Sequence, residues 1–494
     1  MADAAIAATR SAGAEKRHMR CPADGGGEAT RATRYTGRTK TKQTVTGMVW
    51  GGGWLRWLAV LVCIALLGGQ FARTFTAVER YGYLADIMPS DWRATNIWLD
   101  SSECTLTSGA WLAVCEDGRL IPIADRALAD DPGHALILNI RSAITGKRAT
   151  LPDAARISVL VNALGLLAFA MLLIWLGAPI AALVLMLLGP VEYLGWMGLS
   201  PHWAFIGAVS LAAILPLAIA ASAHGLLTRR AGAAWIGFGI AMLAFVTLLR
   251  ESIGLMGLVV TVLALAWTVW RRTARPSRII LVLVLAVVAF LTPRWTVMAR
   301  DGLFDMAPAQ RLERHGLSHT LYLGLGFIEN KWGIRYDDAY GEELAKQLRP
   351  DIEFCSPEYF RLMWRLYVER LVEDPGEIAR LYYEKARMLL GAPTVQPGPS
   401  FGLVLAIGLL ILAVAGRTGA WRHASFPQGE PVVAVSVAFL GLYLAQAMTA
   451  LPSPLYAVPA NAFVLILAGA LAEFAIRGLC SVRRWSVSRR RYRP

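Results

Sequence analysis

The sequence predicts an all-α polytopic membrane protein with two outer-face loops of mixed structure. Hydrophobic residues make up 56% of its 494 residues, and the mean hydropathy is +0.47. Charged residues make up only 17%, whereas soluble domains carry about 25%. Long apolar runs approach the roughly 20 residues that a helix needs to cross the hydrocarbon core of a bilayer.

Ten apolar runs follow one another and predict about ten transmembrane helices. They are Trp54–Phe71, Ile157–Leu176, Ala178–Leu194, Trp203–Ala223, Ala233–Leu249, Ile253–Trp270, Ile279–Leu291, Phe401–Val414, Val432–Met448 and Ala457–Ile476. The first run remains in the chain as an anchor, because no cleavage site of a signal peptide follows it.

Basic residues gather on one predicted side of the membrane. They lie in the N-terminal tail, in the connections around Arg229 and Arg271–Arg278, and in the C-terminal tail from Arg477, whereas the two long loops carry a slight excess of acids. Cytoplasmic loops are enriched in Lys and Arg, so both termini are expected in the cytoplasm. The net charge of +14 predicts no nucleic-acid partner, because no aromatic or groove-reading motif accompanies it.

The predicted domains follow from this threading. They are a disordered basic tail (1–48), a core of seven spans (49–295) with an outer loop at 73–156, an outer-face soluble domain (296–398), three C-terminal spans (399–476) and a basic tail (477–494).

Cys104 and Cys115 lie in the first outer loop and flank the alternating stretch Thr105–Val114. This stretch predicts a hairpin with a turn at Glu116-Asp117-Gly118, and 135–156 predicts a helical return to the membrane. A disulfide is chemically allowed on the outer face. The alternatives are a Cys104–Cys115 bridge, which leaves Cys355 unpaired, or two reduced buried thiols.

The second outer loop predicts two amphipathic helices, at about 357–372 and 375–390. Each begins with a capping side chain followed by Pro and an early acid. Before them lies the glycine- and aromatic-rich segment 322–338. Its glycine spacing and the lack of a strand-then-helix frame exclude a phosphate-binding loop.

Ionisable groups at membrane depth are candidate functional residues, because they are expensive to bury there. Glu79 and Arg80 follow the first span, with Asp86 behind them. Each could instead be an interfacial residue that holds its charge in the headgroup region.

Two short outer turns carry further candidates. Glu192 and His202 bracket the turn between spans three and four, and Arg250-Glu251 interrupts apolar sequence between spans five and six. Exposed turn residues and a helix-end ion pair are the alternatives. The Arg250 pair is the sharpest signal, because a tight outer turn has no need of charge.

The second outer loop adds His319, Trp332, Tyr336 and the pair Asp337-Asp338. The acidic pair could simply begin a surface helix at 339–348. The sequence lacks HExxH, CxxC and GxSxG motifs, which gives metalloprotease, redox and α/β-hydrolase chemistry little support. No cofactor is predicted; a divalent metal is possible but not indicated.

The arrangement resembles the GT-C fold of membrane glycosyltransferases, which includes bacterial protein mannosyltransferase and aminoarabinose transferase relatives. The likeness lies in a cytoplasmic N-terminus, a large loop after span one and a seven-span core, and it covers most of 54–476. Pro454-Leu455-Tyr456 through Pro459 looks like the Arg-Tyr-x-x-Pro entry of the last span, with Leu455 in place of Arg. Glu79 through Leu84 sits where the family has its acidic first-loop motif, although no adjacent acidic pair is present.

This resemblance implies sugar transfer from a polyprenyl-phosphate donor to an acceptor at the outer face of the bacterial inner (cytoplasmic) membrane. A carboxylate must take the proton of the acceptor hydroxyl, a role expected of Glu79 or, second, Asp86. A cation must stabilise the departing phosphate, a role expected of Arg250 with Arg80 or Lys147. The aromatic segment with Trp332 and Tyr336 would contact sugar or acceptor.

Three other functions remain open. An outer-face glycan polymerase or ligase could use His315, His319 and Arg335. A transporter or flippase would predict pseudo-symmetric halves, which the sequence does not display. A non-enzymatic envelope protein would leave the Glu79 and Arg250 regions without a shared cavity. Membrane lipid is an expected partner in every case.

Overall fold

The computed structural model describes residues 53–77, 89–126, 132–197, 206–311, 316–391, 400–418, 429–450, 452 and 460–477. All belong to one unit, Gly47–Pro494. Helices dominate the described residues, and the sheet among them is a two-stranded hairpin. The all-α class predicted by the sequence is therefore confirmed.

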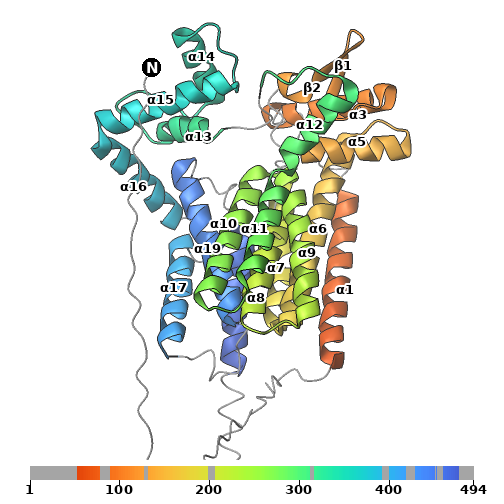
Figure 1. Ribbon diagram of the computed structural model, residues 1–494, viewed down its shortest axis with the longest axis vertical. Helices are drawn as coiled ribbons and strands as arrows, with labels where there is room; N and C mark the ends of the chain where they lie inside the picture. The colour runs from red at the N-terminus through yellow and green to blue at the C-terminus, as the bar shows by residue number, and fades with distance from the viewer. Residues whose placement is uncertain are drawn as a thin grey trace, which may run out of the picture. The chain divides into compact units, whose positions relative to one another are not determined.

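Each of the ten apolar runs coincides largely with a helix (Figure 1). These helices are α1 (Gly53–Ala77), α6 (Leu151–Leu176), α7 (Pro179–Met197), α8 (Ile206–Ala223), α9 (Arg229–Leu249), α10 (Glu251–Trp270), α11 (Pro276–Phe290), α17 (Phe401–Thr418), α19 (Gly429–Thr449) and a last helix, Ala460–Arg477.

Five of these helices are long and apolar enough to cross a membrane by themselves: α6, α9, α10, α19 and the last helix. The bent pair formed by α11 and α12 (Thr292–Phe304) passes the same test when it is taken as one span. Shorter apolar segments lie in α1, α7, α8 and α17. The chain is therefore a membrane protein by composition and helix length, and the number of ten spans remains a prediction.

Close backbone contacts hold the helices around α8, which packs against α6, α9 and α10. Gly165 of α6 and Gly207 of α8 face each other, and a Cβ atom at either position would collide with the backbone of the other helix. The backbone N–H of Gly207 donates to Oδ1 of Asn162 at 2.7 Å. Small residues with a buried polar contact are typical of helix crossings within a bilayer.

A bend of 52° separates α11 from α12. Pro293 lies at the start of α12, and a proline removes a backbone donor and clashes with the preceding turn. The bend turns α12 away from the direction of α11 and toward the first long loop.

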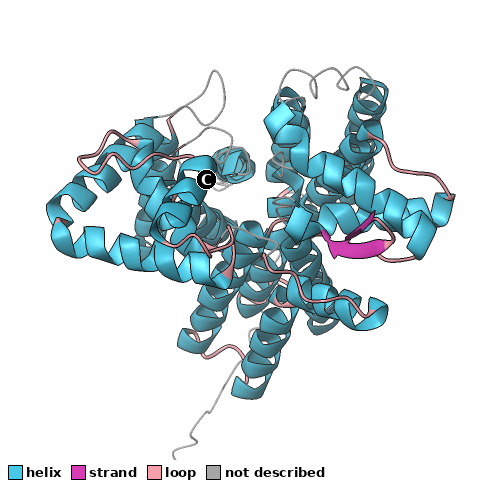
Figure 2. Ribbon diagram, turned by 90° about the horizontal axis from the view of Figure 1, so that it is seen from above, coloured by secondary structure: helices cyan, strands magenta, loops and turns pink. Residues whose placement is uncertain are grey.

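The first loop subdomain consists of α3 (Pro89–Ser108), β1 (Ala113–Glu116), β2 (Arg119–Pro122), α4 (Ile123–Arg126) and α5 (Gly133–Thr145). The strands pair antiparallel with Glu116 opposite Arg119 (Figure 2). Asp117 and Gly118 both have positive φ, 47° and 73°, as a two-residue type I′ hairpin turn requires. The predicted turn is confirmed.

A disulfide joins Cys104 to Cys115, with 5.1 Å between their Cα atoms. It resolves the two alternatives left open by the sequence, and Cys355 is a buried cysteine outside this bridge. The prediction that the stretch after Cys104 is extended was wrong for 105–108, because Cys104 lies on α3 and the bridge joins that helix to β1.

The segment 135–156, which was predicted as one helix returning to the membrane, is divided between two helices, α5 and α6. Gly146 ends α5 with φ of 65°, a left-handed conformation that glycine adopts without strain. Thr150 then caps α6, and its side chain and that of Asp153 form a capping box.

Arg300 of α12 links the two long loops. Its side chain is fully buried, and its Nη1 donates to the carbonyl of Leu112 at 2.8 Å. Trp111 and Phe304 meet edge to face at 4.9 Å, and Met306 packs against Cys104 and Ala113. The beginning of the second loop is therefore seated on the disulfide-bonded hairpin.

The second loop subdomain contains α13 (Leu317–Gly324), η2 (Leu325–Phe327), α14 (Asp338–Leu348), α15 (Pro357–Glu373) and α16 (Pro375–Gly391). Ser356 accepts from the N–H of Tyr359 at 3.2 Å, and Asp374 accepts from that of Glu377 at 3.0 Å. These caps confirm both helices predicted from the sequence.

The second loop subdomain contacts the bundle where α19 ends. The Nζ atom of Lys385 donates to the carbonyls of Met448 and Ala450 at 3.1 and 2.9 Å. Gly324 lies so close to the carbonyl of Thr449 that no side chain would fit there. We call this end of the bundle, where α9 and α19 finish, the loop end.

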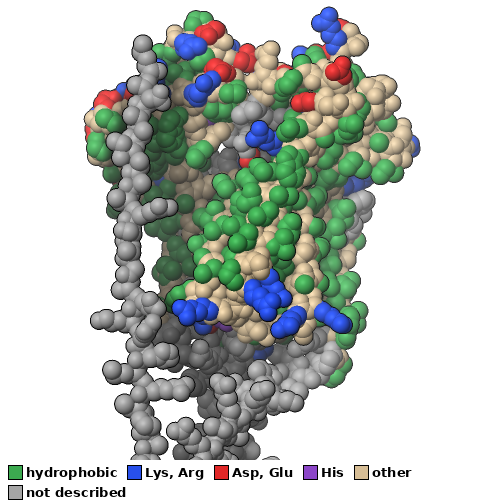
Figure 3. Space-filling view, viewed as in Figure 1, with side chains coloured by type: hydrophobic (Ala, Val, Ile, Leu, Met, Phe, Trp, Pro, Cys, Tyr) green, Lys and Arg blue, Asp and Glu red, His purple; other side chains and the backbone are tan. Residues whose placement is uncertain are grey.

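The opposite end, which we call the basic end, carries the exposed arginines of the connections Arg229-Arg230 and Arg271–Arg278. Arg271 pairs with Glu430 of α19 at 2.8 Å. Figure 3 shows Lys and Arg gathered here, below a face covered with hydrophobic side chains. In the threading predicted from the sequence, the basic end faces the cytoplasm, and this orientation stays a prediction.

Candidate functional site

Arg250 joins two apolar helices at the loop end without an intervening loop. Its N–H donates to the carbonyl of Val246 at 2.7 Å, and its own carbonyl accepts from Ile253 and Gly254 at 3.1 Å. Arg250 is thus both the C-cap of α9 and the N-cap of α10, and its backbone is extended, with φ of −158°. Arg250 and Glu251 are both half-buried, so a charged pair lies at the surface where the bundle meets the loops.

The first loop subdomain reaches this junction through the N-terminus of α5. A Cβ atom on Gly133 would lie 2.6 Å from the carbonyl carbon of Leu248, so the absence of a side chain allows α5 to touch the end of α9. The next residue, His134, is buried and its ring stacks on that of Trp98 with 5.1 Å between centroids. Gly133 therefore brings an imidazole next to the Arg250 junction.

His134 is neutral at every physiological pH. Burial and then the positive charge of Arg250 lower the pKa of His134 to about 3, because both disfavour the imidazolium form. Arg250 is consequently the cationic member of this pair, and His134 can exchange hydrogen bonds without adding charge.

The bundle contributes Tyr443 of α19 to the same region. Tyr443 is buried, with 4% of its surface exposed, and its hydroxyl lies within electrostatic range of Arg250. The charge of Arg250, at the junction of α9 and α10, thus acts on a neutral imidazole of α5 and on a phenol of α19. We call these three residues, Arg250, His134 and Tyr443, the junction cluster.

Several residues that the sequence singled out fall outside this description. Glu79, Arg80, Asp86 and His202 lie outside the described residues, and Glu192 lies on α7 with an undescribed side chain. The proposed meeting of the first-loop carboxylate with Arg250 therefore remains a prediction.

Lys147 is exposed and follows the C-terminus of α5. The 13 residues of this helix span about 20 Å at 1.5 Å per residue. Since His134 occupies the opposite end of the same helix, the structure does not bring Lys147 into the junction cluster. The predicted assistance of Lys147 at the phosphate is not favoured by this placement.

His319 belongs to the interior of the second loop subdomain. Its Nδ1 lies 2.8 Å from the hydroxyl of Tyr359, and its Nε2 lies 3.2 Å from Oδ1 of Asp338. Burial raises the pKa of Tyr359 well above its usual range and keeps the phenol protonated. The neighbouring Asp337 caps α14 by accepting from Ala339 at 3.0 Å. These contacts support the structural alternative for the acidic pair.

Trp332 is fastened to the corner between α15 and α16. Its Nε1 donates to Glu373 at 3.0 Å, and Lys331 and Arg370 lie over its ring. Lys331 also pairs with Asp374 at 2.7 Å, and this pairing raises the pKa of Lys331 while it lowers that of Asp374. Trp332 is therefore engaged in holding its own segment to the subdomain.

Tyr336 is 36% exposed and meets Phe327 edge to face at 6.2 Å. Its accessible surface is compatible with the predicted contact to a sugar.

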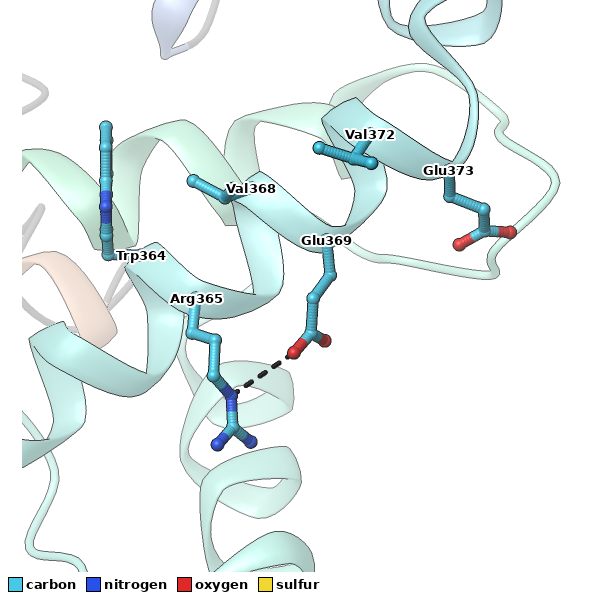
Figure 4. A pocket seen from close by; sticks show the side chains of 6 residues that line it. All are labelled: Trp364, Arg365, Val368, Glu369, Val372 and Glu373. Carbon is cyan, nitrogen blue, oxygen red and sulfur yellow. Dashed lines mark ion pairs between the residues drawn. The ribbon is translucent and has the colours of Figure 1, made fainter.

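An open hollow of about 610 Å³ runs along α15 (Figure 4). Its lining comes from one helix: Trp364, Arg365, Val368, Glu369, Val372 and Glu373. Arg365 and Glu369 pair along the helix at 3.3 Å. One helix cannot surround a substrate with converging polar groups, as binding sites usually do, so we do not place the reaction there.

The sequence did not single out three residues that are buried and polar in the structure, His134, Arg300 and Lys385. For Lys385 a signal was present, because it shares the apolar face of α16 with Ile378, Leu381 and Leu389. A lysine at a core position of an amphipathic helix indicates a specific acceptor. His134 and Arg300 carried no comparable pattern.

Within the described ranges no group of three or more His, Cys, Asp or Glu side chains lies close enough to hold a metal ion. No protein-family model, curated protein or solved structure matches this chain.

Proposed function

We propose that this chain transfers a sugar from a polyprenyl-phosphate donor to an acceptor at the outer face of the membrane. The observation that carries the proposal is the position of Arg250, which is half-buried at the loop end and whose charge acts on His134 of the first loop subdomain and on Tyr443 of α19. A lipid-linked phosphate carried in the outer leaflet would meet the protein at this level.

Arginine suits the departing phosphate for two reasons. Its planar fork donates two parallel hydrogen bonds to phosphate oxygens, and it remains charged at any physiological pH. Partial burial strengthens its attraction for the phosphate, because solvent screens it less. The neutral His134 beside it adds no second positive charge that would hold the product phosphate too tightly.

The reaction proceeds by attack of an acceptor hydroxyl on the anomeric carbon of the sugar. The bond from that carbon to the phosphate oxygen breaks, and polyprenyl phosphate leaves with the electron pair. A carboxylate accepts the hydroxyl proton. From the sequence this base is Glu79, with Asp86 as second choice, and Arg250 stabilises the charge that gathers on the leaving phosphate.

The decisive experiment compares purified variants in lipid nanodiscs supplied with a short polyprenyl-phosphate hexose. We expect Arg250→Ala to lower sugar release by about 100- to 1000-fold, the usual effect of removing a donor from a developing anion, and Arg250→Lys to retain part of the activity. Glu79→Gln tests the base.

Arg349→Ala provides the matched control. Arg349 is an exposed arginine of the second loop subdomain that pairs with Asp351 at 2.9 Å, so its removal should leave turnover unchanged. Undiminished turnover in both Arg250→Ala and Glu79→Gln would contradict the assignment of these residues.

The alternative of a glycan polymerase that uses His319 is less favoured. His319 is 5% exposed, and both of its ring nitrogens face partners inside the subdomain. A catalytic histidine in such an enzyme must reach a substrate.

A further inference from the structure

Helix α5 carries a row of isoleucines on one face. Ile137, Ile140 and Ile144 follow Gly133 at intervals of four, three and four residues, which places all four on one side of a helix. Ile140 is 50% exposed and Ile144 is 79% exposed. We call Ile137, Ile140 and Ile144 the isoleucine face.

The opposite face of α5 is occupied by the first loop subdomain. Ala135 and Leu138 belong to the core around Trp98 and Leu112. Asn139 accepts from the N–H of Leu112 at 3.0 Å. The isoleucine face is therefore turned away from the body of the subdomain.

The direction of the isoleucine face is given by Gly133. This residue begins the same row and rests on the backbone of Leu248 and Leu249, where α9 ends. At its other end, α5 passes through Gly146 into α6, which begins at Leu151. The N-terminus of α5 thus rests on the end of α9, and its C-terminus is joined by residues 146–150 to the start of α6; both of these helices are apolar enough to span a membrane.

Figure 1 shows α5 running across the ends of α6 and α9. The row formed by Gly133 and the isoleucine face begins at the end of α9 and continues outward beyond the ends of α6 and α9. Its exposed members, Ile140 and Ile144, therefore face the level at which α6 enters the bilayer. The outward surface of α6 itself is apolar, with Leu160 and Leu164 46% and 52% exposed.

The charges around α5 match this orientation. Arg141 pairs with Asp153 at 2.8 Å, and Arg148 pairs with Asp100 and Glu103 at 2.9 and 3.0 Å. Both arginines are thus paired with carboxylates of the protein, Arg141 with a nearly buried one and Arg148 at the surface, while the exposed Lys147 follows the helix end. A lysine at this position can extend its ammonium to lipid phosphates beside a buried apolar face.

We propose that α5 is an interfacial helix that inserts its isoleucine face into the outer leaflet of the bilayer spanned by α6 and α9. The occupant of this face is membrane lipid at the boundary of headgroups and acyl chains, where amphipathic helices lie about 5–10 Å deep. Through Gly133 and His134, the same helix reaches the junction cluster. The inserted helix thereby fixes the height of that cluster at the lipid surface.

The test places an environment-sensitive fluorophore on Ile144→Cys in the full chain, with Cys21→Ser and Cys480→Ser as background. The labelled protein is reconstituted in nanodiscs that contain lipids with a nitroxide near the top of the acyl chain. Emission is then compared with and without the nitroxide, and with iodide in the water. Arg119→Cys, on the exposed hairpin turn, is the matched control.

We expect the nitroxide lipid to quench the label at position 144 about threefold more strongly than the label at 119, as shallow insertion predicts, and iodide to show the reverse order. Equal iodide quenching at both positions would overturn the proposal, because it would place the face in water. A label at 144 protected from both quenchers would also overturn it, because a protein partner or second copy would then cover the face.

Disruption of the fold by the labelled cysteine can be excluded as a cause of the quenching. Ile144 is largely exposed, so the substitution should preserve folding, which is checked by the retained Cys104–Cys115 disulfide and by an unchanged elution volume. Ile140→Cys should respond like position 144, since both lie on the isoleucine face.

Discussion

Glu473 and Arg477 form a buried ion pair that connects the last helix to both sides of the turn between α6 and α7. Arg477 donates to Glu473 at 2.8 Å and to the carbonyl of Gly177 at 2.6 Å. Glu473 accepts from the N–H of Ile180 at 2.9 Å. The arginine thus meets the carbonyl end of α6 and the carboxylate meets the amino end of α7, as the helix dipoles favour.

We expect Arg477→Met to lower the free energy of unfolding by about 3–5 kcal/mol, because it leaves a carboxylate buried without its partner. The double variant Arg477→Met with Glu473→Leu should lose less than the two single changes added together. Unfolding in mixed detergent micelles measures both. Arg365→Met removes an exposed pair with Glu369 and should cost only about 0.3–0.5 kcal/mol; an equally small loss for Arg477→Met would contradict the buried role.

Reduction of the Cys104–Cys115 bridge should destabilise the first loop subdomain. The bridge closes a short loop of the chain, 11 residues in sequence separation, for which the chain-entropy account gives about 2–3 kcal/mol. Thermal unfolding of the double serine variant, compared with the parent protein, measures the effect. Intact mass should show the parent lighter by two hydrogens than its reduced form. A parent protein without that mass difference would exclude the bridge.

Acid should destabilise the contact between α5 and the bundle through His134. The pKa of His134 falls to about 3 in the folded protein from about 6.5 in the unfolded chain. The unfolded chain therefore binds the extra proton between these values, so stability falls as the pH drops from about 6.5 toward 3 and is constant above that window.

His134→Phe keeps the stacking on Trp98 and removes the titrating group. The difference in melting temperature between parent and variant, followed from pH 7.5 to 4, isolates the histidine from the carboxylates that titrate in both proteins. An identical acid dependence of the two proteins would show that His134 is already solvated.

Lys385 should give a pH dependence at the alkaline side. Burial lowers the pKa of Lys385 to about 7 from about 10.4 in an unfolded chain. Between these values only the unfolded chain holds the proton, so stability rises as the pH increases from 7 to 10. A neutral amine still has two hydrogens for the carbonyls of Met448 and Ala450.

The variant Lys385→Met should lose this alkaline rise and should be less stable than the parent at pH 9, since two buried carbonyls lose their donor. Lys346→Met is the control, because Lys346 is exposed and pairs with Glu342 one turn away. The melting temperatures of both variants at pH 6.5 and 9 show whether the alkaline rise in stability depends on Lys385. A rise of the same size in Lys385→Met as in the parent would assign it to other groups.

Local signals in the sequence were sufficient to predict the elements that are marked by capping or turn residues of their own. The caps at Ser356 and Asp374 predicted α15 and α16 closely, and Asp117-Gly118 predicted the hairpin turn. Apolar runs predicted the helices, because burial in lipid demands uniform hydrophobicity rather than a pattern shared with distant residues.

Long-range partners could not be predicted in this way. The contact of Arg300 with Leu112 and that of Lys385 with Ala450 depend on how distant segments pack. The apolar face of α16 marks Lys385 as a core position, but it does not identify the carbonyls that accept from it. The sequence selected Arg250 because of its unusual position between spans, yet it gave no sign that His134 lies beside it. Gly133 determines that proximity through a missing side chain, a feature that hydropathy does not record.

The contact between Arg300 and the hairpin implies an order in which the two long loops fold together. The arginine and its acceptor on Leu112 are 188 residues apart, a stretch that a ribosome adds in about 10–40 s at ordinary rates. During that interval the segment with Cys104 and Cys115 is already made, while six further apolar helices, α6 to α11, are still to be added. The hairpin must therefore remain able to bind α12 after it has formed. If the hairpin closed around Leu112 before α12 was made, the guanidinium of Arg300 would lose its buried position.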